Sequence, residues 1–110
     1  MRAYVIDEIS PGDMRKVEGF LKENAISSGL GQIFWVKIPE DLLTATQFEH
    51  RGCQPHGFAV ELGRDRVKLE FFVRSLTRMR CECPGYCTES QRNYVIHFAH
   101  RMIEQLGIRT

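Results

Sequence analysis

The sequence lacks the features that would assign it to a membrane or nucleic-acid class. No apolar run approaches the length needed to cross a membrane, and residues 1–4 lead into a strand-like segment rather than a secretory signal peptide. The formal net charge is only +1, whereas nucleic-acid-binding domains are usually strongly basic. We therefore expect neither a membrane nor a nucleic acid as its partner. Four cysteines without an export signal predict reduced thiols, and hence a cytoplasmic protein.

Catalytic motifs are also missing. The sequence shows no Ser/His/Asp set, no phosphate-binding loop and no pair of acids placed for acid–base catalysis. Gly29 and Gly31 fall between a helical and a strand pattern, which is the wrong order for a dinucleotide-binding turn. These absences predict a binding or interaction module rather than an enzyme, with a protein or a second copy of the chain as its partner.

The composition is that of ordinary globular material. The chain has 110 residues, of which 26% are charged and 43% are hydrophobic, and it contains no repeat, low-complexity run or linker. A chain of this length fits one hydrophobic core. We therefore expect residues 1–110 to form a single domain.

The first half of the chain predicts a strand, a helix and a second strand. Residues 4–6 are strand-like, and Ser10 followed by Pro11 is typical of a helix start. Apolar residues then recur at helical spacing until the glycine-rich residues 28–31, which predict the end of the helix. Residues 33–38 predict a buried strand. This order is typical of a right-handed crossover, so we expect the two strands to be parallel.

The second half predicts a hairpin. Residues 58–62 and 67–73 alternate apolar and polar side chains on either side of residues 63–66. Only one register keeps apolar side chains on one face of the hairpin and polar side chains on the other. Its opposite pairs are Gly63–Arg66, Leu62–Val67, Val60–Leu69, Phe58–Phe71 and Glu61–Lys68. Continued outward, this register places His56 opposite Val73.

Two further helices are predicted. A short one opens at Pro39 and stops near Gly52, with His50 in its last turn, where a donor group satisfies free carbonyls. The last helix follows a Thr-x-x-Gln capping box, Thr88 to Gln91, and ends before residue 107, a glycine. An unbroken apolar stripe makes it the most regular helix of the chain.

The predicted order is strand, helix, strand, short helix, strand, strand, helix. It resembles a ferredoxin-like split βαβ layout that lacks its last strand. We therefore expect an α+β two-layer sandwich in which about four strands carry helices on one face. The resemblance concerns layout alone and implies no function.

Three of the four cysteines lie within seven residues, in the segment Cys81-Glu82-Cys83-Pro84-Gly85-Tyr86-Cys87. Cys81 and Cys83 share one face if the chain is extended there, and the Pro-Gly pair fits a type II turn that returns Cys87 toward Cys83. The predicted hairpin brings Cys53 and His56 to the same end of the sheet. Several sulfur and nitrogen ligands are therefore expected to face one point.

This cluster has three interpretations. The first is a structural zinc site made by Cys81, Cys83, Cys87 and Cys53, with His56 as a possible replacement for Cys53. The Cys-x-Cys-x-x-x-Cys spacing differs from the common paired Cys-x-x-Cys knuckle and from ferredoxin-type spacings. The predicted function is thus a small binding module that carries zinc.

The second interpretation is thiol redox chemistry. Cys87 directly precedes a helix N-cap, where the helix dipole favours a thiolate, and Cys83 would be its resolving partner. The Cys-x-x-Cys spacing of thioredoxin-like motifs is absent. In the third interpretation the cysteines are small core residues without function.

Two other groups of residues invite weaker hypotheses. His97, His100 and Glu104 lie at helical spacing and could bind a metal or transfer protons, although a solvated helix face explains them as well. Phe72 and Arg74 alternate along the hairpin, as in sheets that stack single-stranded RNA. The low net charge favours a covered sheet face instead.

Overall fold

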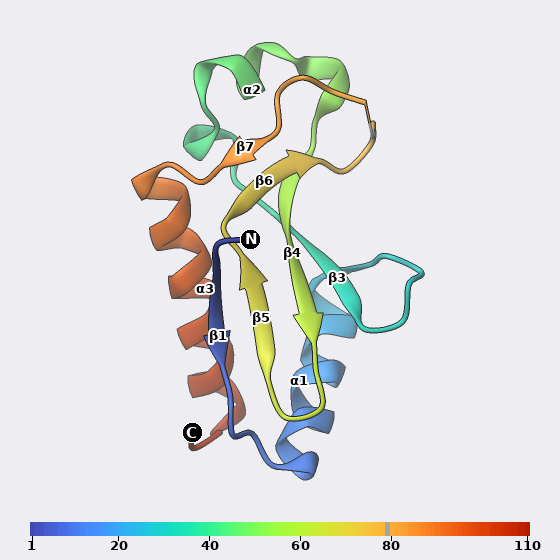
Figure 1. Ribbon diagram of the computed structural model, residues 1–110, viewed down its shortest axis with the longest axis vertical. Coiled ribbons are helices and arrows are strands. Elements are labelled where there is room, and N and C mark those ends of the chain that lie inside the picture. The colour runs from blue at the N-terminus through green and yellow to red at the C-terminus, as the bar shows by residue number, and fades with distance from the viewer. Residues whose placement is uncertain (79) are drawn as a thin grey trace.

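The structure, a computed structural model, describes residues 1–78 and 80–110. In these residues seven strands, all paired antiparallel, form a sheet curled into a half-barrel, together with three α-helices (Figure 1). The strands are β1 (Ala3–Ile6), β2 (Ile26–Ser27), β3 (Ile33–Lys37), β4 (His56–Leu62), β5 (Val67–Glu70), β6 (Phe72–Ser75) and β7 (Gly85–Tyr86). The helices are α1 (Pro11–Asn24), α2 (Ala45–Glu49) and α3 (Glu89–Leu106), and short 3-10 turns are η1 (Glu40–Leu42) and η2 (Arg51–Cys53).

This architecture corrects the expected four-stranded ferredoxin-like sandwich. The main strand order is β1-β5-β4-β3-β2, and β6 pairs with one end of β4 and carries β7. The expectation that the first two predicted strands are parallel is also wrong. β1 and β3 are separated by β5 and β4, and because every neighbouring pair is antiparallel, β1 and β3 run in opposite directions.

The difference begins at the end of α1. The helix ends at Asn24, and β2 then pairs with β3 through Ile26–Trp35 and Ser27–Phe34. Gly29 and Gly31 have positive φ angles of 81° and 68°, which glycine adopts without a steric penalty. These glycines therefore reverse the chain inside a hairpin instead of ending a helix, and the two-residue strand before them carries too little pattern to be predicted.

The predicted register holds at the turn of the β4–β5 hairpin and fails at its far end. The Gly63 amide donates to the Arg66 carbonyl at 2.8 Å. The observed pairs include Leu62–Val67, Glu61–Lys68 and Val60–Leu69. The ladder breaks at Phe71, whose amide donates to the Arg2 carbonyl. Beyond the break His56 faces Ser75 instead of Val73, so the register has moved by two residues.

The core lies between the inner side of the sheet and the two long helices. α1 and α3 lie on the same side of the sheet (Figure 1). Their buried apolar residues share one cluster with the alternate residues of β3, β4 and β5; its fully buried members include Val17, Leu21, Phe58, Val60, Val67, Leu69, Val95, Ala99 and Met102. Because alternate residues of these strands are apolar and buried, they determine which face of the sheet packs against the helices.

The helix ends follow the sequence signals. Ser10 caps α1, and Thr88 with Gln91 forms the reciprocal capping box that begins α3. Gly107 ends α3 in the left-handed conformation, with a φ angle of 65°. In residues 1–78 and 80–110, none of the helices combines the length and the apolar character that a membrane crossing requires.

Candidate metal or redox site

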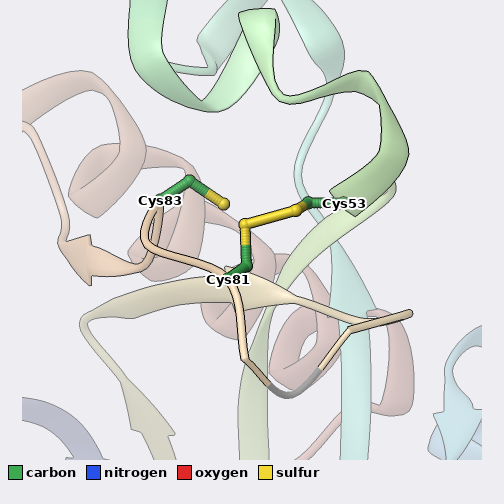
Figure 2. Close-up of side chains that lie close together, drawn as sticks. All are labelled: Cys53, Cys81 and Cys83. Carbon is green, nitrogen blue, oxygen red and sulfur yellow. A yellow bond between two sulfur atoms is a disulfide. The ribbon is translucent and has the colours of Figure 1, made fainter.

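Three cysteine sulfurs meet at the end of the sheet that lies next to α2. Cys53 ends η2, and Cys81 and Cys83 belong to the loop between β6 and β7 (Figure 1). Their Sγ atoms all lie within 4.8 Å of one another. Figure 2 shows the Cys53 and Cys81 sulfurs at disulfide-bonding distance, with the Cys83 side chain directed toward them. The Cys53 and Cys81 Cα atoms are 6.6 Å apart, which suits a disulfide.

His56 adds a nitrogen to this group. Its Nε2 lies 3.1 Å from Cys83 Sγ, and the residue is only 1% exposed. Burial lowers the pKa of His56, with a further lowering from the nearby His50, and burial raises the pKa of the Cys83 thiol. Both shifts favour neutral partners, so without a bound cation the pair is a thiol and an imidazole rather than a thiolate and an imidazolium.

The other ring nitrogen of His56 is unusual. Among the described residues, its Nδ1 is buried and has no hydrogen-bond partner. Buried polar atoms are nearly always hydrogen-bonded, so the unpartnered Nδ1 singles out His56 as a side chain that packing alone does not explain. The orphaned nitrogen thus sits on a side chain that already faces the cysteine cluster.

Ser75 holds the Cys53 segment against the end of β6. Its hydroxyl donates to the Cys53 carbonyl at 2.5 Å and accepts from the backbone amides of Thr77 and Arg78. The Thr77 hydroxyl makes longer contacts with the carbonyls on either side of Cys53. Strand pairing between β4 and β6 brings these segments together. The two-residue shift in register is therefore what places Ser75, rather than Val73, beside the site.

Positive charge lies next to the Cys53 segment. The Arg78 side chain packs over the turn that carries Cys53. Its nearer guanidinium nitrogen lies 3.4 Å from the position that a Cβ atom would take at Gly52. A cation at this place lowers the cost of negative charge on nearby thiolates.

A buried glutamine pair supports Cys83 from the other side. Gln91 Nε2 donates to Gln47 Oε1 at 2.9 Å, and Gln47 Nε2 donates to the Cys83 carbonyl at 3.4 Å. Both glutamines belong to capping boxes, with Thr88 for α3 and with Thr44 for α2. Gln47 is not among the residues predicted above, although Thr44-x-x-Gln47 has the same capping-box spacing as Thr88-x-x-Gln91. The starts of two helices are thereby connected to the cysteine loop.

Cys87 does not join the cluster of three sulfurs. It follows β7 and packs, half-buried, against the hydrophobic core, and its amide donates to the Phe71 carbonyl at 3.0 Å. Burial raises the pKa of the Cys87 thiol to about 11, and the nearby Arg92 opposes this only partly. Pairing of β7 with β6 fixes this position, because Tyr86 faces Phe72 and Gly85 faces Val73. The type II turn expected to fold Cys87 back toward Cys83 is replaced by this strand pairing.

The remaining candidates lie elsewhere. His50 caps α2, and its Nδ1 is 2.5 Å from the Thr46 carbonyl, in the role that the sequence predicts. His97 and His100 are both exposed but line different hollows, and His100 Nε2 is 2.6 Å from the Tyr4 hydroxyl. Arg74 lies over the rings of Phe72 and Trp35, at 5.0 and 5.6 Å from their centroids.

The arrangement offers two kinds of chemistry. Three sulfurs and one imidazole can hold a metal ion, and two sulfurs at bonding distance beside a third can exchange a disulfide. Comparison of the chain with protein families, with curated proteins and with solved structures gives no match. The geometry and chemistry of the site are therefore what indicate a function.

Proposed function

We propose that this protein is a small cytoplasmic binding module, without catalytic activity, whose β6–β7 loop is held by a structural zinc site in its reduced form. The ligands are Cys53, Cys81, Cys83 and His56. The proposal rests chiefly on the three Sγ atoms within 4.8 Å of one another, with His56 Nε2 at 3.1 Å from the third. Cys87 is left out because its sulfur does not belong to this group.

The donor set suits zinc better than other common ions. Three soft sulfurs and one imidazole nitrogen are a typical tetrahedral zinc set, whereas calcium and magnesium take oxygen ligands. Zinc–sulfur bonds of about 2.3 Å in a tetrahedron separate the sulfurs by about 3.8 Å. The site reaches this spacing if the reduced Cys53 and Cys81 sulfurs move apart.

The protonation of the cluster also favours a metal over a free thiolate. Burial keeps Cys83 protonated and His56 neutral, so neither residue carries charge at neutral pH without a cation. A divalent ion displaces the thiol protons and supplies the positive charge that a buried thiolate needs. Its coordination would connect η2, the start of β4 and the β6–β7 loop, and would shape one end of the molecule for a protein partner or a second copy.

The test is the metal content of protein purified under reducing conditions without added metal. We expect about one zinc per chain. Only one thiol should then react with a thiol reagent, and three more should become reactive after a chelator is added. A protein with no metal and four reactive thiols from the start would contradict the proposal.

A thiol redox protein is the second candidate, favoured by the disulfide-bonding distance between Cys53 and Cys81. In this reaction the Cys83 thiol gives its proton to His56 Nε2, and its sulfur attacks the Cys81 sulfur. A Cys81–Cys83 disulfide forms, and Cys53 leaves as a thiolate, so no outside oxidant is needed. Peptide mapping of non-reduced, metal-free protein tests this candidate. Recovery of the Cys53–Cys81 disulfide together with the Cys81–Cys83 disulfide would favour it.

A further inference from the structure

Residues from the end of α1, from η1 and from α3 line a cleft of about 590 Å³, which we call the α1–α3 cleft. Clefts that bind small molecules commonly measure about 300–1,000 Å³. The cleft contains none of the cysteines, so it is independent of the proposed zinc site.

The floor of the cleft is aromatic and firmly packed. Phe20, Tyr94 and Phe98 line it. Phe98 makes edge-to-face contacts with Phe20 and with the fully buried Phe58, at centroid distances of 6.1 and 5.9 Å. Tyr94 also meets Phe58 edge to face, at 6.5 Å. Such contacts fix the orientations of the rings. Phe20, Tyr94 and Phe98 are only half-buried, so part of each ring remains available to a planar apolar ligand.

The rim is polar and carries positive charge only. Asn93, His97, Arg101 and Gln105 follow one another at intervals of four residues, so they form one row along α3 beside the cleft. None of the ten residues that line the cleft is acidic. Among the described residues, Arg101 takes part in no salt bridge, so its guanidinium has no anionic partner in the protein.

We propose that the α1–α3 cleft binds a small aromatic carboxylate. Its ring would rest on Phe20, Tyr94 and Phe98, and its carboxylate would meet Arg101, whose planar fork of donors matches a carboxylate. His97 and Asn93 lie one and two turns earlier on the same row and offer further hydrogen bonds. The chemistry follows from an aromatic floor, a cationic rim and the absence of any acid among the lining residues.

The experiment is an amide NMR titration of the full chain with 2-naphthoate and, separately, with 2-naphthamide. The two probes share a ring system and differ in charge. We expect saturable shifts at α3 residues of the rim and at the end of α1, with naphthoate binding about fivefold more tightly than naphthamide. Absence of saturable shifts, shifts centred elsewhere, or equal affinity for both probes would overturn the proposal.

Two variants separate a local contact from a general effect of charge. Arg101→Ala should remove the preference for naphthoate and leave naphthamide binding unchanged. Arg64→Ala removes an equal charge from the exposed β4–β5 turn and should keep the preference intact. Both side chains are exposed, so both variants are expected to fold. An equal loss of preference in the two variants would also overturn the proposal.

Discussion

Cys83 and Cys87 lie four residues apart and occupy two different chemical environments. Cys83 is buried beside His56 and two further sulfurs, and a glutamine from a helix cap donates to its carbonyl. Cys87 is half-buried against the hydrophobic core and stands outside the sulfur cluster. Proximity in sequence therefore does not decide which cysteines act together; the strand between them does, because β7 carries Cys87 toward the core.

The first prediction separates these two cysteines by their effect on metal binding. Cys83→Ala removes a proposed ligand and should lower zinc affinity by more than about 100-fold. This exceeds the loss of about 10- to 100-fold that is usual when only a hydrogen-bond partner of a ligand is removed. Cys87→Ala should retain one zinc per chain and cost only about 1 kcal/mol of stability through lost packing. Competition with a chromophoric chelator measures both affinities. Loss of zinc from Cys87→Ala, with Cys83→Ala unaffected, would reverse the assignment.

The second prediction concerns the reactivity of Cys87. Because its pKa is raised to about 11, its thiolate fraction should rise about tenfold per pH unit, and its alkylation rate should increase about 100-fold from pH 8 to pH 10. Alkylation of zinc-loaded protein, followed by mass spectrometry, measures this rate. Cys87→Ser should abolish the pH-dependent product. A rate that levels off below pH 9 would contradict the raised pKa.

The same shift has a consequence for stability. Folding raises the pKa of Cys87 above its ordinary value of 9.0, so the folded protein holds this proton more tightly than the unfolded chain does. The resulting stabilisation is complete below pH 9 and is lost as the pH rises to about 11. Between pH 9 and about 11, the melting temperature of the native chain should therefore fall relative to that of Cys87→Ser. Below pH 9 the difference between the two melting temperatures should not change with pH.

The third and smallest effect concerns the support of the proposed site. Ser75→Ala removes the hydroxyl that holds the Cys53 carbonyl and should lower zinc affinity by about tenfold without removing a ligand. Ser90→Ala is a matched control, because Ser90 lies at the start of α3 and lines the α1–α3 cleft instead. Equal affinities in Ser75→Ala and the native chain would show that this hydrogen bond does not position Cys53.

Local signals in the sequence predict much of the secondary structure but not its assembly. Ser10, Thr88 with Gln91, and the Gly63–Arg66 turn each act within a few residues, and each is found where it was predicted. The strand order depends on a two-residue strand and on glycines that fit either a helix stop or a hairpin. A short pattern cannot distinguish the two.

The candidate site shows the same division. Convergence of Cys53, His56, Cys81 and Cys83 at one end of the sheet follows from the hairpin, and the structure brings these residues close together. The position of Cys87 and the role of Ser75 depend on the break between β5 and β6 at Phe71, whose amide donates to the carbonyl of Arg2, just before β1. Such a long-range bond has no local signature.

X-ray absorption at the zinc edge of the reduced, zinc-loaded protein tests the proposed ligand set most directly. Three sulfurs at about 2.3 Å and one nitrogen at about 2.0–2.1 Å are expected, from Cys53, Cys81, Cys83 and His56. The same three-to-one pattern should persist in Cys87→Ala. A four-sulfur pattern that changes in Cys87→Ala, or zinc surrounded only by nitrogen and oxygen, would contradict the proposed site.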